Sequence, residues 1–136
     1  MTGSGRILAA VAAGGAVGAA ARHAATLAWP APEHGFPWVV LGVNVTGCAL
    51  IGVLMVLTVE RGTVTHPLVR PFLGVGVLGG FTTFSTYAAG VARLLDRQEE
   101  LIAVAYAVST TVAALGAVWG AAVLTRALAD RWGRAV

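Results

Sequence analysis

Four long apolar stretches separated by short polar ones dominate the chain. They run from about 7 to 29, 37 to 59, 68 to 95 and 101 to 124. About 20 consecutive apolar residues suffice for a helix to cross the hydrocarbon core of a bilayer. The pattern therefore predicts an all-α membrane protein, in which residues 1–136 form a single domain of four transmembrane helices.

The third stretch contains a run that a continuous helix tolerates poorly. Residues 79–87 read GGFTTFSTY, a glycine pair followed by alternating hydroxyl and aromatic side chains. About 28 residues at about 1.5 Å each are also long for a straight span. We therefore predict that the third helix is broken at its centre, at Gly79-Gly80. Non-helical backbone at that depth must be buried in protein or line a polar cavity, and broken helices often build ion sites.

Composition supports a membrane protein with almost no soluble part. Of the 136 residues, 57% are hydrophobic and 11% are charged, and the mean hydropathy is +0.81. Every basic residue other than histidine is arginine, and the net charge of +3 is too small and dispersed to indicate nucleic-acid binding. The single cysteine, Cys48, excludes an intrachain disulfide and has no metal-ligand companions. We interpret it as a packing residue.

The first stretch has two interpretations. Arg6 ahead of an apolar run resembles a signal peptide, but the run is long, so we favour a retained first span. Gly14 and Gly18 are spaced for close helix packing. Arg22 lies inside the span, where arginine is costly unless it reaches water. It either extends to the interface near the helix end or stands at the mouth of an anion path.

Polar residues in the second and fourth stretches also allow two roles. Asn44 either makes an interhelical hydrogen bond or donates its amide into a polar pathway. Tyr106 and Thr110 are four residues apart and share a helix face. Hydroxyls in the fourth stretch, including that of Ser109, either bond to the preceding turn of their own helix or continue the pathway.

The polar groups within the spans are mainly hydrogen-bond donors, which suit an anion. The interior has no Asp or Glu, and Arg22 carries its only charge. Phe84 and Tyr87 are three apart and could present their electropositive ring edges to the same ion. Carbonyls freed at the glycine pair would instead suit a hard cation such as Na⁺. Because four spans enclose little volume, we expect a homo-oligomer, most simply a dimer.

Two other classes of protein compete with an anion pathway. A small four-span, dual-topology multidrug or cation exporter would need a glutamate inside its first span, and the first 32 residues contain no acidic residue. A structural subunit would need no row of donors. An enzyme is not expected, because His23, His34 and His66 share no ligand spacing and no nucleophile has a base at a motif distance.

The distribution of arginine favours cytoplasmic termini, although weakly. An even number of spans places both termini on one side, together with six arginines against three on the other. Because the loops are short and of mixed charge, insertion in both orientations is conceivable.

The chain resembles the Fluc (CrcB) family of bacterial fluoride channels over nearly its whole length. The resemblance lies in residues 14–23, 42–48, 79–87 and 106–119, and the third of these runs is the most specific. It implies an antiparallel, dual-topology dimer of four-helix subunits with two fluoride pathways. It also implies passive, fluoride-selective efflux that protects the cytoplasm, and a structural Na⁺ at the dimer centre.

The resemblance assigns roles to particular residues. Main-chain carbonyls of Gly79 and Thr82 would hold Na⁺, and Arg22 would line the vestibule. The fluoride pathway would comprise Asn44, Thr83, Phe84, Ser85, Tyr87, Tyr106 and Thr110.

Two features depart from the family pattern. Tyr87 stands where a second phenylalanine is usual, and its hydroxyl could bind the anion or narrow the path. The arginine bias exceeds what ideal dual topology requires, so the partner could be a second copy or an oppositely oriented homologue.

Overall fold

The computed structural model describes residues 3–64 and 66–133, and every regular element in those ranges is helical. Helix α1 covers Gly3–Ala28. The second span consists of α2 (Trp38–Met55) and a π-helical turn, η1 (Val56–Glu60). The third consists of π-helical η2 (Arg70–Leu78), α3 (Gly79–Phe81) and α4 (Ser85–Asp96), and the fourth is α5 (Glu100–Gly133).

Within these two ranges, four helical segments are long and apolar enough to cross a membrane, as the hydrophobic pattern predicts. They are Gly3–Ala28, Trp38–Glu60, Arg70–Asp96 and Glu100–Gly133. Many large apolar side chains face outward, as expected for helices surrounded by lipid.

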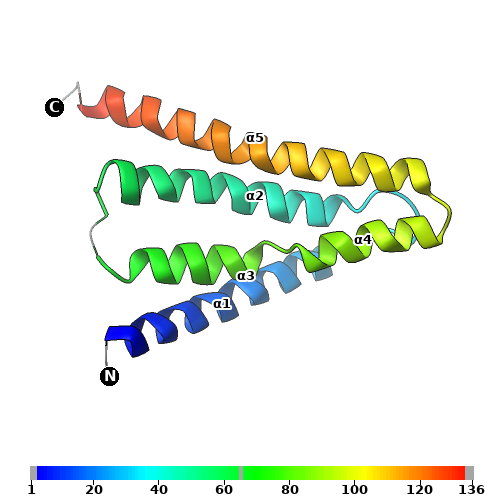
Figure 1. Cartoon of the computed structure of the whole chain (residues 1–136), viewed down its shortest axis with the longest axis horizontal. Coiled ribbons are helices and arrows are strands. Elements are labelled where there is room, and N and C mark those ends of the chain that lie inside the picture. Colours follow the sequence, from blue (N-terminus) through cyan, green and yellow to red (C-terminus); the bar gives the residue numbers. More distant parts are fainter. Residues whose placement is uncertain (1–2, 65, 134–136) are drawn as a thin grey trace.

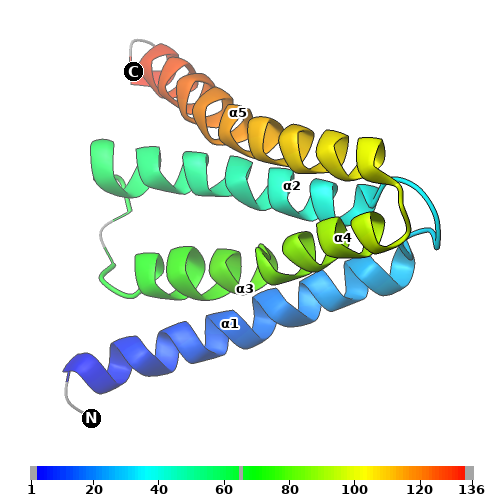
Figure 2. The same ribbon diagram turned by 45° about the vertical axis from the view of Figure 1, so that its right-hand side comes forward.

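The spans lie side by side, with α1 and α5 on opposite sides of the bundle and the other two spans between them (Figures 1 and 2). Helix α1 packs against η2 and α3, whereas α5 packs against α2 and α4. Both chain ends lie at the same end of the bundle (Figure 1). We call this the terminal end, and the end with the turn between α4 and α5 the turn end.

Small residues allow α1 to approach the third span closely. A side chain on Gly14 would overlap the carbonyl oxygen of Phe72, and one on Gly18 would overlap that of Val77. The predicted packing role of these two glycines is therefore confirmed. Close backbone approach replaces side-chain interdigitation along this contact, a common arrangement in membrane helices.

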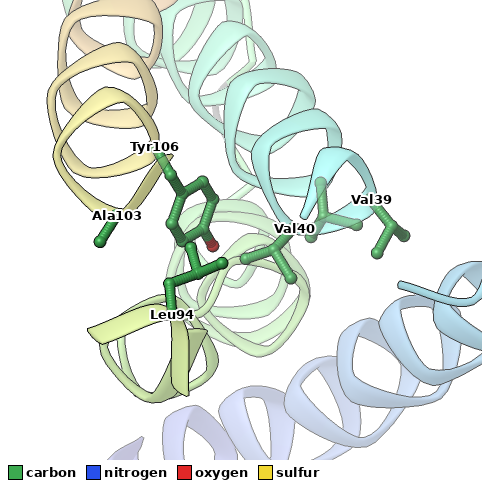
Figure 3. Packing of buried hydrophobic residues seen from close by; sticks show 6 residues of the cluster. Val39, Val40, Leu94, Ala103 and Tyr106 are labelled. Carbon is green, nitrogen blue, oxygen red and sulfur yellow. The ribbon is translucent and has the colours of Figure 1, made fainter. Parts of the chain in front are cut away.

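The buried core lies on the other side of the third span, where α2, α4 and α5 meet. Its members are Val39, Val40, Val43, Leu94, Ala103 and Tyr106. Figure 3 shows the Tyr106 ring reaching from α5 towards Leu94 of α4 and Val40 of α2. The ring fits because residue 90 is glycine: a Cβ there would lie 3.1 Å from the ring.

Polar contacts close the bundle at its two ends. At the terminal end, Arg126 donates through two nitrogens to the Glu60 carboxylate at 2.7 Å each, and Arg61 pairs with Asp130. At the turn end, Glu99 accepts the Gly35 amide at 3.0 Å and lies 2.8 Å from His34 Nδ1.

The turn after α4 positions Glu99 for these contacts. Gln98 has a positive φ of 62°, and the Glu99 amide donates to the Leu94 carbonyl at 2.9 Å while the Gln98 amide donates to that of Leu95. This is the Schellman arrangement, in which a left-handed residue ends the helix. The loop before α2 thus becomes attached to the loop before α5.

Candidate functional site

The third span changes its backbone conformation just after the glycine pair. Thr82 is extended, with φ −73° and ψ 154°; Phe84 already has helical dihedral angles, and helix α4 begins at Ser85. Gly79 itself is helical, with φ −66° and ψ −36°. A Cβ on Gly80 would lie 2.5 Å from the Gly15 carbonyl oxygen. The predicted position of the break was therefore wrong: Gly80 serves helix packing, and the residues that belong to no helix are 82–84.

Asn44 holds the non-helical segment through two hydrogen bonds. Its Oδ1 accepts the Thr83 amide at 2.8 Å, and its Nδ2 donates to the Thr83 carbonyl at 3.0 Å. One carboxamide thus satisfies both backbone groups of one residue, as a neighbouring strand would. Asn44 makes the interhelical contact that was one of its two predicted roles, and its Nδ2 retains a second hydrogen.

The Thr83 side chain starts helix α4. Its Oγ1 accepts the Thr86 amide at 3.1 Å and donates to Thr86 Oγ1 at 3.0 Å, and Ser85 Oγ lies 3.4 Å away. A threonine hydroxyl that accepts an amide of the first helical turn is a typical N-terminal cap. With only 8% of its surface exposed, Thr83 is a buried polar anchor.

These side-chain contacts free two main-chain carbonyls. In a continuous helix the Thr83 amide would donate to the Gly79 carbonyl, but it donates to Asn44 instead. Likewise, the Thr86 amide would donate to the Thr82 carbonyl, but it donates to the Thr83 hydroxyl. Both carbonyls are left available to another electropositive partner.

Arg22 satisfies the carbonyl between these two positions. Its Nε donates to the Gly80 carbonyl oxygen at 3.2 Å, in a partly buried contact between α1 and α3. A cation at the carbonyl end of a helix is favourably placed relative to the helix dipole. Arg22 therefore contacts the end of α3.

Phe84, Tyr87 and Tyr106 form a chain of aromatic rings across α4 and α5. Ring centroids are 5.7 Å apart for Phe84 and Tyr87, and 5.4 Å apart for Tyr87 and Tyr106. Phe84 is 79% exposed although it lies in the middle of a span, whereas Tyr106 is fully buried. The Tyr87 hydroxyl donates to the Ala107 carbonyl at 3.1 Å. Its hydrogen is therefore engaged with α5.

Two buried hydroxyls on α5 contrast with that of Tyr87. Within the described part of the chain, neither the Tyr106 hydroxyl nor Thr110 Oγ1 has a hydrogen-bond partner. Thr111, the next residue, bonds to the carbonyl of Ala107 in its own helix at 3.0 Å. An unsatisfied buried polar group costs about 1–3 kcal/mol of stability. The Tyr106 and Thr110 hydroxyls therefore remain available to donate to a further partner, and we call them the unpaired donors.

A groove of about 340 Å³ brings most of these groups together. Six predicted site residues line it: Asn44, Thr82, Thr83, Phe84, Tyr87 and Thr110. Three others were not predicted as site residues: Cys48, Thr111 and Ala114. Ser85, Tyr106 and Arg22 do not line the groove, although each contacts a residue of the same region.

Thr111 is the residue that sequence reasoning overlooked. Its Oγ1 lies 3.5 Å from the Tyr87 hydroxyl, and both oxygens approach the Ala107 carbonyl. The only available signal was its position beside Thr110, four residues after Ala107. Side-chain metal ligands are not a feature of this region, since no cluster of His, Cys, Asp or Glu suited to a metal occurs in residues 3–64 and 66–133.

This arrangement defines a class of small four-span membrane protein in which side chains of α2, α4 and α5 converge on a non-helical segment inside the third span. A family model described as "CrcB-like protein, Camphor Resistance (CrcB)" matches residues 9–122. The chain belongs to this family.

Curated relatives support the same placement. The chain is 55% identical to "Fluoride-specific ion channel FluC 1" of Streptomyces coelicolor, over 85% of this chain and 75% of that protein. It is 51% identical to "Fluoride-specific ion channel FluC 2" of Thermobifida fusca, over 92% of each. It is also 51% identical to "Fluoride-specific ion channel FluC 2" of Nocardia farcinica, over 82% of this chain and 79% of that protein.

The predicted family is therefore confirmed, and the family is one of ion channels rather than enzymes. Together with the four membrane-spanning helices, this membership identifies a multi-pass protein of the cell membrane.

Proposed function

We propose that this chain forms a fluoride-specific channel for passive fluoride efflux, which lowers fluoride in the cytoplasm and so protects against its toxicity. The observation that carries the proposal is the groove in which Asn44, Phe84, Tyr87 and Thr110 meet beside the non-helical segment. The names of the similar proteins specify the ion.

The groove offers an anion weak, closely spaced donors in place of its water. The Thr110 hydroxyl, which has no partner in residues 3–64 and 66–133, and the second amide hydrogen of Asn44 can both donate. The exposed ring of Phe84 adds an electropositive edge. The start of α4 contributes the positive end of a helix dipole. Because no carboxylate lies among these residues, the groove has no charged group to repel fluoride.

Tyr87 contributes its ring to the pathway, and its hydroxyl has another role. The hydroxyl hydrogen is directed at the Ala107 carbonyl, so the oxygen could present only lone pairs to an anion. Tyrosine at position 87, in place of the family's usual phenylalanine, thus keeps the aromatic ring edge and also attaches α4 to α5. This contact argues against direct anion binding by the Tyr87 hydroxyl.

The freed carbonyls fit a structural Na⁺ that is not transported. Oxygen ligands without charge suit a hard monovalent cation, and Gly79 and Thr82 are the two residues whose usual helical donors bind elsewhere. Bound there, the ion would supply positive charge that holds the carbonyl ends in place. Asn44 and Thr83 would act by keeping those two carbonyls free of amide donors.

We further propose that the working unit is an antiparallel, dual-topology dimer, in which the third helix is functionally broken at residues 82–84. The high exposure of Phe84 beside this groove supports this, since a second subunit would cover both. The partner is a second copy or an oppositely oriented homologue.

Fluoride efflux from liposomes that contain only this purified chain tests the channel. A fluoride electrode should record rapid release, and the same liposomes loaded with chloride should release none. Lack of fluoride release from a well-folded dimer would overturn the single-chain channel, after which co-reconstitution with a homologue would test the paired form. Restored growth of a fluoride-sensitive bacterium would test the protective role.

Removal of Na⁺ gives a separate test of the cation site. Dimer stability should fall when Na⁺ is replaced by a large organic cation, and N44A should weaken this dependence because Asn44 would no longer hold the Thr83 backbone in place beside the Gly79 and Thr82 carbonyls. Equal stability in both media would contradict the cation assignment without affecting the fluoride result.

A further inference from the structure

The turn end of the bundle contains a second polar cavity, separate from the fluoride groove. Its volume is about 220 Å³. One wall is the loop between α1 and α2, and the other is the C-terminal half of α4. We call it the Arg93–Arg97 cavity; its lining is Ala31, Pro32, Glu33, Gly35, Pro37, Gly90, Arg93, Leu94 and Arg97.

Its two arginines differ from Arg61 and Arg126 at the other end of the bundle. Arg61 and Arg126 are neutralised by Asp130 and Glu60. Within the described residues, Arg93 and Arg97 form no ion pair with a carboxylate. Arg93 lies in the last turn of α4 and Arg97 directly follows the helix, and both line the same cavity.

The neighbouring charges limit what this cavity can bind. Glu33 is one of the residues that line the cavity, and Glu99 is close enough to Arg97 for an electrostatic interaction between their charges. The Glu99 carboxylate, however, is occupied by the Gly35 amide and His34. The carbonyl end of α4 favours one or two cations nearby. This preference of the helix end for cations does not by itself explain why Arg93 and Arg97 line an open cavity.

The cavity also lies where lipid headgroups would be expected. It adjoins the end of the span Arg70–Asp96. Trp29 and Trp38, both largely exposed, flank the loop that forms its outer wall. Exposed tryptophans at span ends typically mark the membrane interface. The loop wall is held in place by the contacts of Glu99 with His34 and the Gly35 amide.

We propose that the Arg93–Arg97 cavity binds a phosphate group, presented by a membrane phospholipid. Paired guanidinium groups match the oxygens of a phosphate through forked hydrogen bonds. Two arginines and one glutamate also complement a headgroup that carries a phosphate and an ammonium, so Glu33 favours phosphatidylethanolamine over phosphatidylglycerol. This site is independent of fluoride conduction.

Native mass spectrometry of the purified chain with each phospholipid tests the proposal. The double variant R93Q/R97Q should lose bound lipid about tenfold relative to the unsubstituted chain. The matched control R6Q/R70Q removes the same charge at the terminal end and should retain it. Equal loss in both variants, or no loss in either, would overturn the site.

Two further arms identify the ligand. E33Q should shift the preference from phosphatidylethanolamine towards phosphatidylglycerol. Competition of lipid by millimolar inorganic phosphate would support the same phosphate site with a soluble source, whereas binding of neither phosphate nor phospholipid would refute it. Far-ultraviolet circular dichroism and fluoride efflux of R93Q/R97Q verify that the variant is folded, so failure of lipid binding is distinguishable from failure of the channel.

Discussion

The two sides of the third span pack against their neighbours in different ways. Towards α1, glycines let backbones touch, and a side chain on Gly14 or Gly18 has no room. Towards α2 and α5, contacts are made by Asn44, Thr83 and Tyr87 side chains, and two buried hydroxyls on α5 have no hydrogen-bond partner among the described residues. The side facing α1 is therefore a rigid support, whereas the side facing α2 and α5 keeps hydrogen-bond donors available for an ion.

Disruption of the glycine contact should have the largest effect. In G18A the new methyl would overlap the Val77 carbonyl and lie 2.8 Å from the Phe81 amide nitrogen. Because backbone cannot move aside easily, we expect a loss of about 3 kcal/mol or more in folding stability. Thermal unfolding in detergent measures it. G15A is the control, since a Cβ there meets nothing within 4 Å; equal melting of the two variants would contradict the packing account.

Removal of the Asn44 carboxamide should have the next largest effect. N44A loses both hydrogen bonds to Thr83 and leaves buried backbone groups unsatisfied, which should cost about 2–3 kcal/mol. Fluoride efflux should fall by about tenfold or more, because the carboxamide is also lost as a donor in the groove and a lost interaction of about 1.4 kcal/mol with the ion corresponds to a factor of ten. T46V, on the same helix but exposed, should conduct normally. Normal efflux by N44A would remove Asn44 from the pathway.

Replacement of Thr110 separates stability from conduction. T110V deletes a buried hydroxyl that has no partner in the described structure, so stability should stay the same or rise by up to about 1 kcal/mol. Fluoride efflux should nevertheless drop severalfold, because a free donor is lost from the groove. The neighbouring T111V removes a hydroxyl already bound to its own helix and should conduct almost normally. Faster fluoride efflux through T110V than through T111V would contradict the proposal that the Thr110 hydroxyl donates to the anion.

The Tyr87 hydroxyl should have a smaller effect. Y87F removes the bond to Ala107 but keeps the ring, so stability should fall by about 0.5–1.5 kcal/mol and fluoride selectivity over chloride should persist. Paired melting curves and efflux assays measure both quantities. Loss of selectivity in Y87F would show that the hydroxyl itself contacts the anion.

The loop contact at the turn end should show the smallest effect, visible as a pH dependence. The hydrogen bonds from His34 and the Gly35 amide hold the pKa of Glu99 below its usual 4.5. A depressed carboxyl pKa stabilises the fold above the unfolded-state value and ceases to do so as the pH falls through the folded-state value. The stability difference between the parent and E99Q should therefore shrink as the pH falls below about 4.5, the ordinary pKa of a glutamate, and vanish only below the folded-state pKa of Glu99. E100Q serves as the control, and an undiminished difference in acid would contradict this linkage.

Much of the architecture was predictable from the chain alone. The apolar pattern predicts four membrane helices because membrane thickness sets their length. The GGFTTFSTY run and the residues around Asn44 identify the family, and both contribute to the groove. The absence of acidic residues within the apolar stretches also follows from the sequence and favours anions over cations.

Tertiary structure decided what each polar group does. Spacing could not show that Gly80 serves packing while Thr82 becomes extended, because the choice depends on how closely α1 approaches. Nor could it show that Thr111 bonds to its own helix while Thr110 has no partner within the described chain. Sequence determines which donors and acceptors exist and at what depth. Only the distances between packed helices determine which of them satisfy one another and which remain for an ion.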